Sequence, residues 1–336
     1  MKLIRVLTML AFASTVGAIA DANEQAGDPW LRPAQVPAPA TNIPSFERIE
    51  LGRALFFDPR LSGSNWISCA TCHNPALGWS DGLATAIGHG FKTLRRKTPT
   101  VLNTAYNPLQ MWDGRKPTLE DQALGPISSA DEMNLPLEAL VAKIKAIDGY
   151  APLFAKAYPG EAISAETIAK AIASFERTVV STESPFDRWR AGDEQAVSAS
   201  VKRGFDVFQN KGRCTMCHQG FNFTDNGFHN IGIKSSGGED DVGRFAHRKV
   251  KVNKGAFKTP TLRDVELTAP YMHNGIYKTL ADVVDHYDRG GDIKDNLDPN
   301  MQPLSLSAQE KSDLVNFLKS LTGTRMLVSL PALPPN

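Results

Sequence analysis

Apolar side chains recur three and four positions apart in four segments of this chain, the spacing that gives a helix one buried face. Residues 49–57 and 201–208 open the first and second halves with this pattern, and residues 168–180 and 307–321 close them. The last segment begins with Ser-Ala-Gln-Glu, whose first and fourth side chains can cap a helix. We therefore expect each half to begin and end with an amphipathic helix, as in an internal repeat.

Between these helices the sequence is rich in Gly and Pro and predicts few, short strands. Residues 137–147 and 152–157 are expected to add two helices to the first half, and residues 185–192 lie between the halves. A chain of 336 residues exceeds the usual size of one hydrophobic core. The pattern predicts a mostly α fold with two related domains, over residues 45–183 and 184–336.

Each half also carries one Cys-x-x-Cys-His motif soon after its first helix, formed by Cys69, Cys72 and His73 and by Cys214, Cys217 and His218. This motif attaches a c-type haem: the thiols bond to the vinyl groups, and the imidazole becomes the proximal iron ligand. A Cys-x-x-Cys pair alone could form a zinc site, a redox pair or a disulfide. Here a His follows both pairs, and the chain has only four cysteines. The motifs predict two covalently bound haem c groups in two cytochrome c-like domains, with the haems facing a shared interface.

The N-terminus has the composition of an export signal. Lys2 and Arg5 precede an apolar run that ends in small residues near position 20, and no stop-transfer segment follows. Residues 1–22 are therefore predicted to be a secretory signal peptide, and residues 23–44, rich in Pro and Ala from position 33, an extended lead-in. The mature protein is expected in the periplasm, without membrane insertion. A net charge of +1, with acids and bases interspersed, indicates no nucleic-acid partner.

The remaining histidines and methionines leave the sixth iron ligands open. Two six-coordinate haems would only carry electrons, whereas an open iron position beside an acid–base group would support peroxide chemistry. Periodicity does not rank the candidates, which are His89, His229, His247, His273, His286, Met111, Met133, Met216, Met272, Met301 and Met326.

Several motifs between and after the haem sites resemble the bacterial dihaem cytochrome c peroxidase and MauG family. In the first half these are Trp-Asp-Gly-Arg at 112–115, Glu-Asp-Gln-Ala-Leu-Gly-Pro at 120–126, and Glu132-Met133. In the second half they lie at 228–232, 258–263 and 269–275. The likeness runs from about residue 51 to about residue 323 and keeps the order of the motifs.

The resemblance implies a role for each matching residue. His73 would hold the haem that reacts with peroxide, and Trp112 would lie between the two haems. Glu132 would move a proton between the two peroxide oxygens, and Gln122 and Pro126 would line the same pocket. From the residues alone, the alternative for Trp112 is a core aromatic. Glu132 could be a helix-start acid, and Asp131 is its alternative in the pocket.

Two positions point to different branches of the family. His89, in Ile-Gly-His-Gly, matches a loop histidine that closes the peroxidatic haem in resting peroxidases and that MauG lacks; a solvated loop histidine is the alternative. Tyr287 aligns with a ligand of the C-terminal haem that is Met in the peroxidases and Tyr in MauG. A tyrosinate stabilises ferric and higher states rather than ferrous iron. His286 and Met272 remain rival ligands, and Met301 fits poorly.

The family's Asn ligand for Ca²⁺ before Thr-Pro-Thr is replaced here by Lys97, so calcium at that site is doubtful. The resemblance implies an oxidoreductase that uses hydrogen peroxide. Its reductant would be a periplasmic electron-donor protein or an oxidisable side chain of a protein substrate. The alternative is a non-catalytic dihaem electron-transfer cytochrome.

Overall fold

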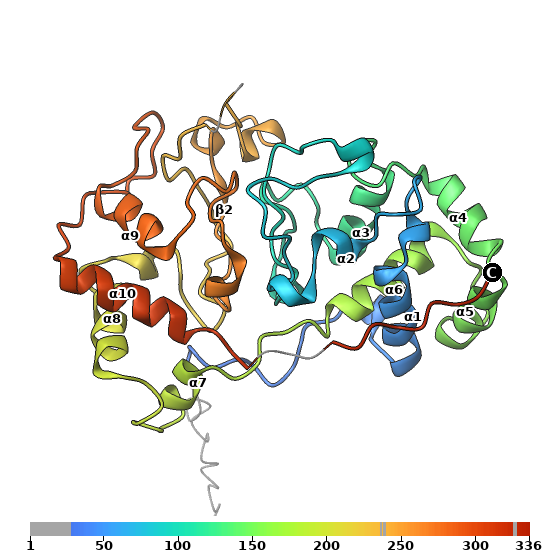
Figure 1. Cartoon of the computed structure of the whole chain (residues 1–336), viewed down its shortest axis with the longest axis horizontal. Helices are drawn as coiled ribbons and strands as arrows, with labels where there is room; N and C mark the ends of the chain where they lie inside the picture. The colour runs from blue at the N-terminus through green and yellow to red at the C-terminus, as the bar shows by residue number, and fades with distance from the viewer. Residues whose placement is uncertain (1–27, 236, 238–239, 325–327) are drawn as a thin grey trace, which may run out of the picture.

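The computed structural model describes residues 28–235, 237, 240–324 and 328–336, so the predicted signal peptide lies outside the described residues. Figure 1 shows two helical halves side by side, joined by extended segments along one edge. Within the described residues, no helix is long and apolar enough to cross a membrane. The expected mostly α fold is confirmed.

The first half contains α1 (Phe46–Phe57), α2 (Cys69–Cys72), α3 (Leu119–Ser128), α4 (Leu137–Lys145), α5 (Ala151–Ala157) and α6 (Ala165–Glu176). The second contains α7 (Pro185–Arg190), α8 (Ala199–Gln209), α9 (Leu280–Asp288) and α10 (Ala308–Ser320). Its strands β1 (Phe228–His229) and β2 (Phe257–Lys258) pair antiparallel.

The six predicted helices correspond to α1, α4, α5, α6, α8 and α10. Ser307 and Glu310 form the expected capping box of α10. Helix α6 ends at Glu176, before the predicted end at residue 180, where β-branched residues follow. Helices α2, α3, α7 and α9 were not predicted from periodicity.

The two halves use the same helix crossing. Helix α1 packs on α6 in the first half, as α8 packs on α10 in the second. A glycine lies at each crossing: a Cβ on Gly52 would be 1.9 Å from the Ala171 carbonyl oxygen, and one on Gly204 would be 2.0 Å from that of Asp313. Only glycine permits so close an approach of two backbones, so the repeat extends to the packing of the core.

Two equivalent backbone hydrogen bonds join the halves. The N–H of Lys97 donates to the carbonyl of His273 at 2.8 Å, and the N–H of Lys258 donates to the carbonyl of Trp112 at 2.8 Å. Both lysines precede Thr-Pro-Thr. The same element of each half therefore binds the same element of the other, in a pseudo-twofold arrangement.

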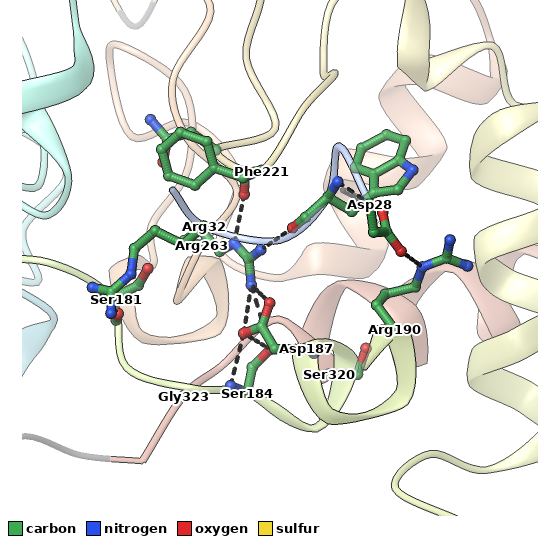
Figure 2. A network of polar contacts seen from close by, with 12 residues as sticks. Asp28, Arg32, Ser181, Ser184, Asp187, Arg190, Phe221, Arg263, Ser320 and Gly323 are labelled. Carbon is green, nitrogen blue, oxygen red and sulfur yellow. Dashed lines mark hydrogen bonds and ion pairs between the residues drawn. The ribbon is translucent and has the colours of Figure 1, made fainter. Parts of the chain in front are cut away.

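The chain ends cross between the halves. Arg263, almost fully buried in the second half, donates to the carbonyl of Trp30 at 2.7 Å, to Asp187 and to the carbonyl of Phe221 (Figure 2). Trp30 itself is buried in the core of the second half. At the other end, residues 328–336 run back along the first half, where Arg60 donates to the carbonyl of Pro334 (Figure 1).

These crossings depart from the expected boundaries. The predicted lead-in of residues 23–44 contributes a core tryptophan to the second half, and the end of the predicted second domain lies on the first half. Residues 33–41 are mostly exposed, as expected for an extended segment. The two termini therefore tie the halves together in addition to the contacts at their interface.

The crossing glycines give a stability prediction. Gly204→Ala places a methyl group where the α10 backbone lies, so we expect a loss of about 1–3 kcal/mol in the free energy of unfolding. Gly125→Ala in α3 is the matched control, because its Cβ would meet only the flexible end of Lys116, at 3.3 Å. That variant should be unchanged or gain up to about 1 kcal/mol of helix propensity. Guanidinium unfolding of the two holoproteins checks this, and equal midpoints would contradict it.

Candidate haem sites and peroxide pocket

Both haem motifs are built in the same way. His73 Nδ1 lies 3.3 Å from the carbonyl oxygen of Trp79, and His218 Nδ1 lies 2.8 Å from that of Phe223. Trp79 and Phe223 both have positive φ, 60° and 50°, which turns each carbonyl toward its histidine. A hydrogen bond at Nδ1 fixes the ring and leaves Nε2 available to a metal.

The electrostatics of the motifs fit covalent haem attachment. Burial lowers the pKa of His73, and it lowers that of His218 to about 4, so both rings stay neutral as ligation requires. Burial also raises the pKa of the Cys72 thiol to about 11 and that of Cys214 to about 12. Apolar surroundings disfavour a thiolate metal site but suit thioether bonds to a porphyrin. None of the four cysteines forms a disulfide.

One cavity, lined by residues of both halves, contains the candidate ligands of the C-terminal haem. It is lined by Cys214, Cys217 and His218, and also by Met272, Tyr287 and Met301. Burial beside the two thiols raises the pKa of the Tyr287 phenol.

His286 differs from these candidates because both of its ring nitrogens are occupied. Nδ1 lies 2.9 Å from the Tyr277 hydroxyl, and Nε2 lies 2.8 Å from the Ile231 carbonyl oxygen. The ring is fully buried between these partners. It could ligate iron only by giving up a buried hydrogen bond, which costs about 1–3 kcal/mol.

The three residues that the resemblance assigns to the peroxide pocket come together through a backbone return. Gln122 and Pro126 are one turn apart on α3, so they share a helix face. After α3 the chain folds back: Met133 N–H donates to the Pro126 carbonyl at 3.1 Å, and Leu135 N–H to that of Ile127 at 2.8 Å. This return carries Glu132 alongside the end of α3.

Glu132 and its neighbour have different environments. Glu132 is half-buried, and burial raises the pKa of its carboxyl, an effect that nearby Arg115 opposes. Asp131 is exposed and forms an ion pair with Lys92 at 2.5 Å. Glu132 is therefore the more shielded of the two carboxyl groups, whereas Asp131 is a surface charge.

The His89 loop is joined directly to the Glu132 segment. The N–H of His89 donates to the carbonyl of Glu132 at 2.8 Å, and a Cβ on Gly88 would lie 2.0 Å from the carbonyl oxygen of Asp131. The His89 side chain is half-buried, and its Nδ1 is shielded from solvent without a hydrogen-bond partner in the described structure. This is an environment unlike that of a fully solvated loop histidine.

Trp112 lies at the interface between the halves. Its Nε1–H donates to the carbonyl of Lys97 at 2.9 Å, and its own carbonyl accepts from Lys258 of the second half. It also lines the cavity that contains His218 and Tyr287. A core aromatic of one domain would not have these neighbours.

Lys97 is buried, and its ammonium donates to the Ser80 hydroxyl at 3.1 Å. Burial lowers the pKa of this amine, and Asp81 opposes the shift. The side chain thus brings a cation into the site where the family resemblance implies Ca²⁺.

Sequence reasoning missed two charged residues near the first haem motif. Glu176 is buried in α6 close to Cys69; burial raises its pKa to about 8, and one of its oxygens has no partner in the described structure. The positive charge of Arg115 acts to lower the pKa of Glu132. An acid following the apolar face of residues 168–175 was the available signal for Glu176, and Arg115 belongs to the Trp-Asp-Gly-Arg motif, to which no role for the arginine was assigned.

Comparison with known proteins agrees with this geometry. The profile described as di-haem cytochrome c peroxidase matches residues 46–195, and the cytochrome c profile matches residues 201–322. The methylamine utilization protein MauG of Methylorubrum extorquens is 48% identical over 306 residues, covering 91% of this chain and 86% of that protein. The chain belongs to the di-haem cytochrome c peroxidase and MauG family. Its two cytochrome c-type domains imply haem c binding, and it is a di-haem enzyme of the peroxidase type.

Two further relatives place the chain within this family. The cytochrome c551 peroxidase of Pseudomonas aeruginosa is 36% identical over 337 residues, covering 97% of this chain and 93% of that protein. The crystal structure of a MauG-like protein associated with microbial copper homeostasis superposes with a TM-score of 0.80 at 32% identity, covering 88% of this chain and 95% of that one.

The buried Lys97 gives a prediction about calcium. We expect a chelator to leave the spectrum and turnover of the holoenzyme unchanged, because the ammonium already supplies a positive charge at this position. Lys97→Asn removes that charge and provides an amide oxygen, a type of ligand that Ca²⁺ accepts. The variant should gain a calcium dependence of turnover, measured by titration after chelation. Lys145→Asn on exposed α4 is the control, and a wild-type enzyme that loses activity with chelator would contradict the prediction.

Proposed function

We propose that this chain is a periplasmic, H₂O₂-dependent oxidoreductase that oxidises a protein partner through two covalently bound haems. The partner is a protein substrate with an oxidisable side chain, as in a MauG-type reaction, or a small electron-donor protein. The carrying observation is the backbone hydrogen bonding that brings Glu132, α3 and the His89 loop together in the half of the first haem motif. The higher identity to a relative named MauG, 48% against 36% for the peroxidase, supports the MauG-type reaction.

His73 and His218 would hold the two irons, with the paired cysteines as thioether anchors. A haem held by His73, Cys69 and Cys72 would supply the redox chemistry needed to cleave the peroxide O–O bond. The carboxylate of Glu132 takes a proton from one peroxide oxygen and returns it to the departing oxygen, which leaves as water. Arg115 favours the ionised carboxylate, and Gln122 and Pro126 limit the access of water.

Oxidising equivalents are proposed to pass between the halves through Trp112. Its indole donates to the carbonyl of Lys97 within the first half, its backbone carbonyl accepts from Lys258 of the second half, and the residue lines the cavity that contains His218. Tyr287 would hold the C-terminal haem iron together with His218, since both side chains line the same cavity. The occupied nitrogens of His286 support Tyr287 over that rival, and a tyrosinate suits an oxidised rather than a ferrous store.

A non-catalytic electron carrier is the second candidate function. A carrier would need both irons six-coordinate at all times. His89 Nδ1 has no hydrogen-bond partner among the described residues, which is compatible with either function. The half-buried Glu132, whose raised pKa a carrier would not use, favours the peroxidase.

The proposed function is tested at Glu132. Glu132→Gln should keep both haems but slow the reaction with stoichiometric H₂O₂ by about 10²–10⁴-fold, because the amide cannot accept the proton. Burial raises the Glu132 pKa, so the wild-type rate should fall as pH drops through a value above that of an ordinary glutamate. The rate of the Glu132→Gln variant should not show this decrease at low pH.

Asp131→Asn is the matched control, because Asp131 is the exposed neighbour on the same turn, and it should be nearly silent. Stopped-flow spectra over pH provide the measurement. A wild-type protein that does not react with peroxide would favour the carrier, and a fast Glu132→Gln enzyme would remove Glu132 from the proton transfer.

The axial ligand is tested separately. Tyr287→Phe should change the ferric spectrum and raise the reduction potential of the C-terminal haem, because the phenolate that stabilises ferric iron is lost. Tyr271→Phe, in the wall of the same cavity, should leave both unchanged. A Tyr287→Phe spectrum identical to wild type, with a changed spectrum for Met272→Ala, would assign the ligand to methionine.

A further inference from the structure

The second half carries a strongly basic surface segment, residues 247–254. It contains Arg248, Lys249, Lys251 and Lys254 and no acid, in a chain whose net charge is only +1. Val250 and Val252 between these cations are 55% and 67% exposed. In the described part of the chain, only Lys254 among the four cations has a carboxylate within 4 Å, that of Asp295 at 3.4 Å.

This basic segment is anchored to the turn that holds Trp112. Arg244, just before it, is buried and donates to the carbonyls of Asp113 and Gly114 at 2.7 and 2.9 Å. Its guanidinium also lies 4.0 Å from the centre of the Phe228 ring. In Figure 1 this part of the chain lies at the top of the second half, on the side toward the first half. The basic segment therefore borders the interface between the halves.

Residues that hydrogen-bond to the basic segment adjoin the cavity that contains His218. Asn296 donates to the carbonyls of Lys251 and Lys254 at 2.9 Å, and Asn230 donates to that of Lys254 at 3.3 Å. Ile231 and Asp298, which adjoin these loops, line the cavity that contains His218.

A second connection leads from the end of the basic segment to Trp112. Phe257 stacks on His273 with ring centres 3.6 Å apart, and the N–H of Lys258 donates to the Trp112 carbonyl at 2.8 Å. A protein bound on the basic segment would thus be separated by few residues from both the C-terminal haem site and Trp112.

We propose that the basic segment, residues 247–254, is the docking surface for a redox-active protein with an acidic contact face. This proposal rests on the proposed function and names the chemistry of its protein partner. Exposed cations steer an acidic partner and raise its association rate, and the exposed valines supply apolar contact inside a polar rim. A second copy of this chain fits poorly, because two such segments would repel each other.

The test uses the holoenzyme and a reduced acidic cupredoxin as probe. Lys249→Glu/Lys251→Glu reverses two charges on the basic segment, and Lys145→Glu/Lys156→Glu reverses two exposed charges on α4 and α5. At low ionic strength, we expect the first double variant to lower kcat/KM for cupredoxin oxidation by H₂O₂ about tenfold or more. Calorimetric affinity for the oxidised cupredoxin should weaken in parallel, and the wild-type rate should fall with added salt. The control should match wild type.

Three further measurements separate the outcomes. The rate of oxidation of a neutral hydroquinone by H₂O₂ should be equal in both variants and wild type. If the wild-type enzyme does not oxidise the hydroquinone, the proposed function is wrong. In that case the calorimetric affinity for the cupredoxin would still test the docking proposal. Equal cupredoxin rates and affinities in wild type and Lys249→Glu/Lys251→Glu would overturn the docking proposal, as would a preference for a basic cytochrome c. Binding to anionic phospholipid vesicles that the variant loses, with cupredoxin oxidation unchanged, would assign the basic segment to a membrane surface and also overturn it.

Discussion

The pair of backbone hydrogen bonds between the halves is the constraint on which the proposed site depends. Lys97 N–H binds the carbonyl of His273, and Lys258 N–H binds that of Trp112, each at 2.8 Å. Each bond contributes only about 1 kcal/mol of net stability. Their geometry matters more, because together they fix the relative rotation of the two halves and place Trp112 against both.

The same backbone scaffold appears in both halves, but equivalent positions carry different side chains. Met111 and Met272 have φ near 73° and 71°, and Gly114 and Gly275 have 64° and 62°, so the turns that hold Trp112 and His273 are equivalent. One turn presents an indole and the other an imidazole stacked on Phe257. A symmetric backbone thus carries asymmetric chemistry.

A similar contrast follows each Thr-Pro-Thr, where Leu102 of the first half corresponds to Arg263 of the second. Leu102 is simply buried core, whereas Arg263 uses its guanidinium to hold the N-terminal segment and the linker at Asp187. That buried charge is satisfied by an acid and two carbonyls, as burial of a cation requires. The second half therefore anchors the chain crossings as well as its own core.

The sequence was sufficient for the repeat, the haem motifs and six helices, because these depend on local periodicity and spacing. It did not reveal α3, since Pro126 within the helix argues against one, nor the return that carries Glu132 beside α3. The backbone hydrogen bond from His89 to Glu132 joins two loops distant in the sequence. Such bonds do not depend on the side chains, so the sequence has no pattern that predicts them. The net charge of the whole chain did not reveal the basic segment either, because acids elsewhere in the chain offset its four cations.

The two residues that point to different branches of the family belong to separate structural units. His89 lies on a loop of the first half held by the Glu132 carbonyl and by a stack of Trp66 on Phe91 at 5.2 Å. Tyr287 lies on α9 of the second half, in a cavity wall that contains none of these groups. A tyrosinate at the second haem would therefore change that haem's potential without touching the contacts that position His89. Retention of the loop histidine together with Tyr287 is thus structurally consistent, and control of the His89 loop is expected to reside in the first half itself.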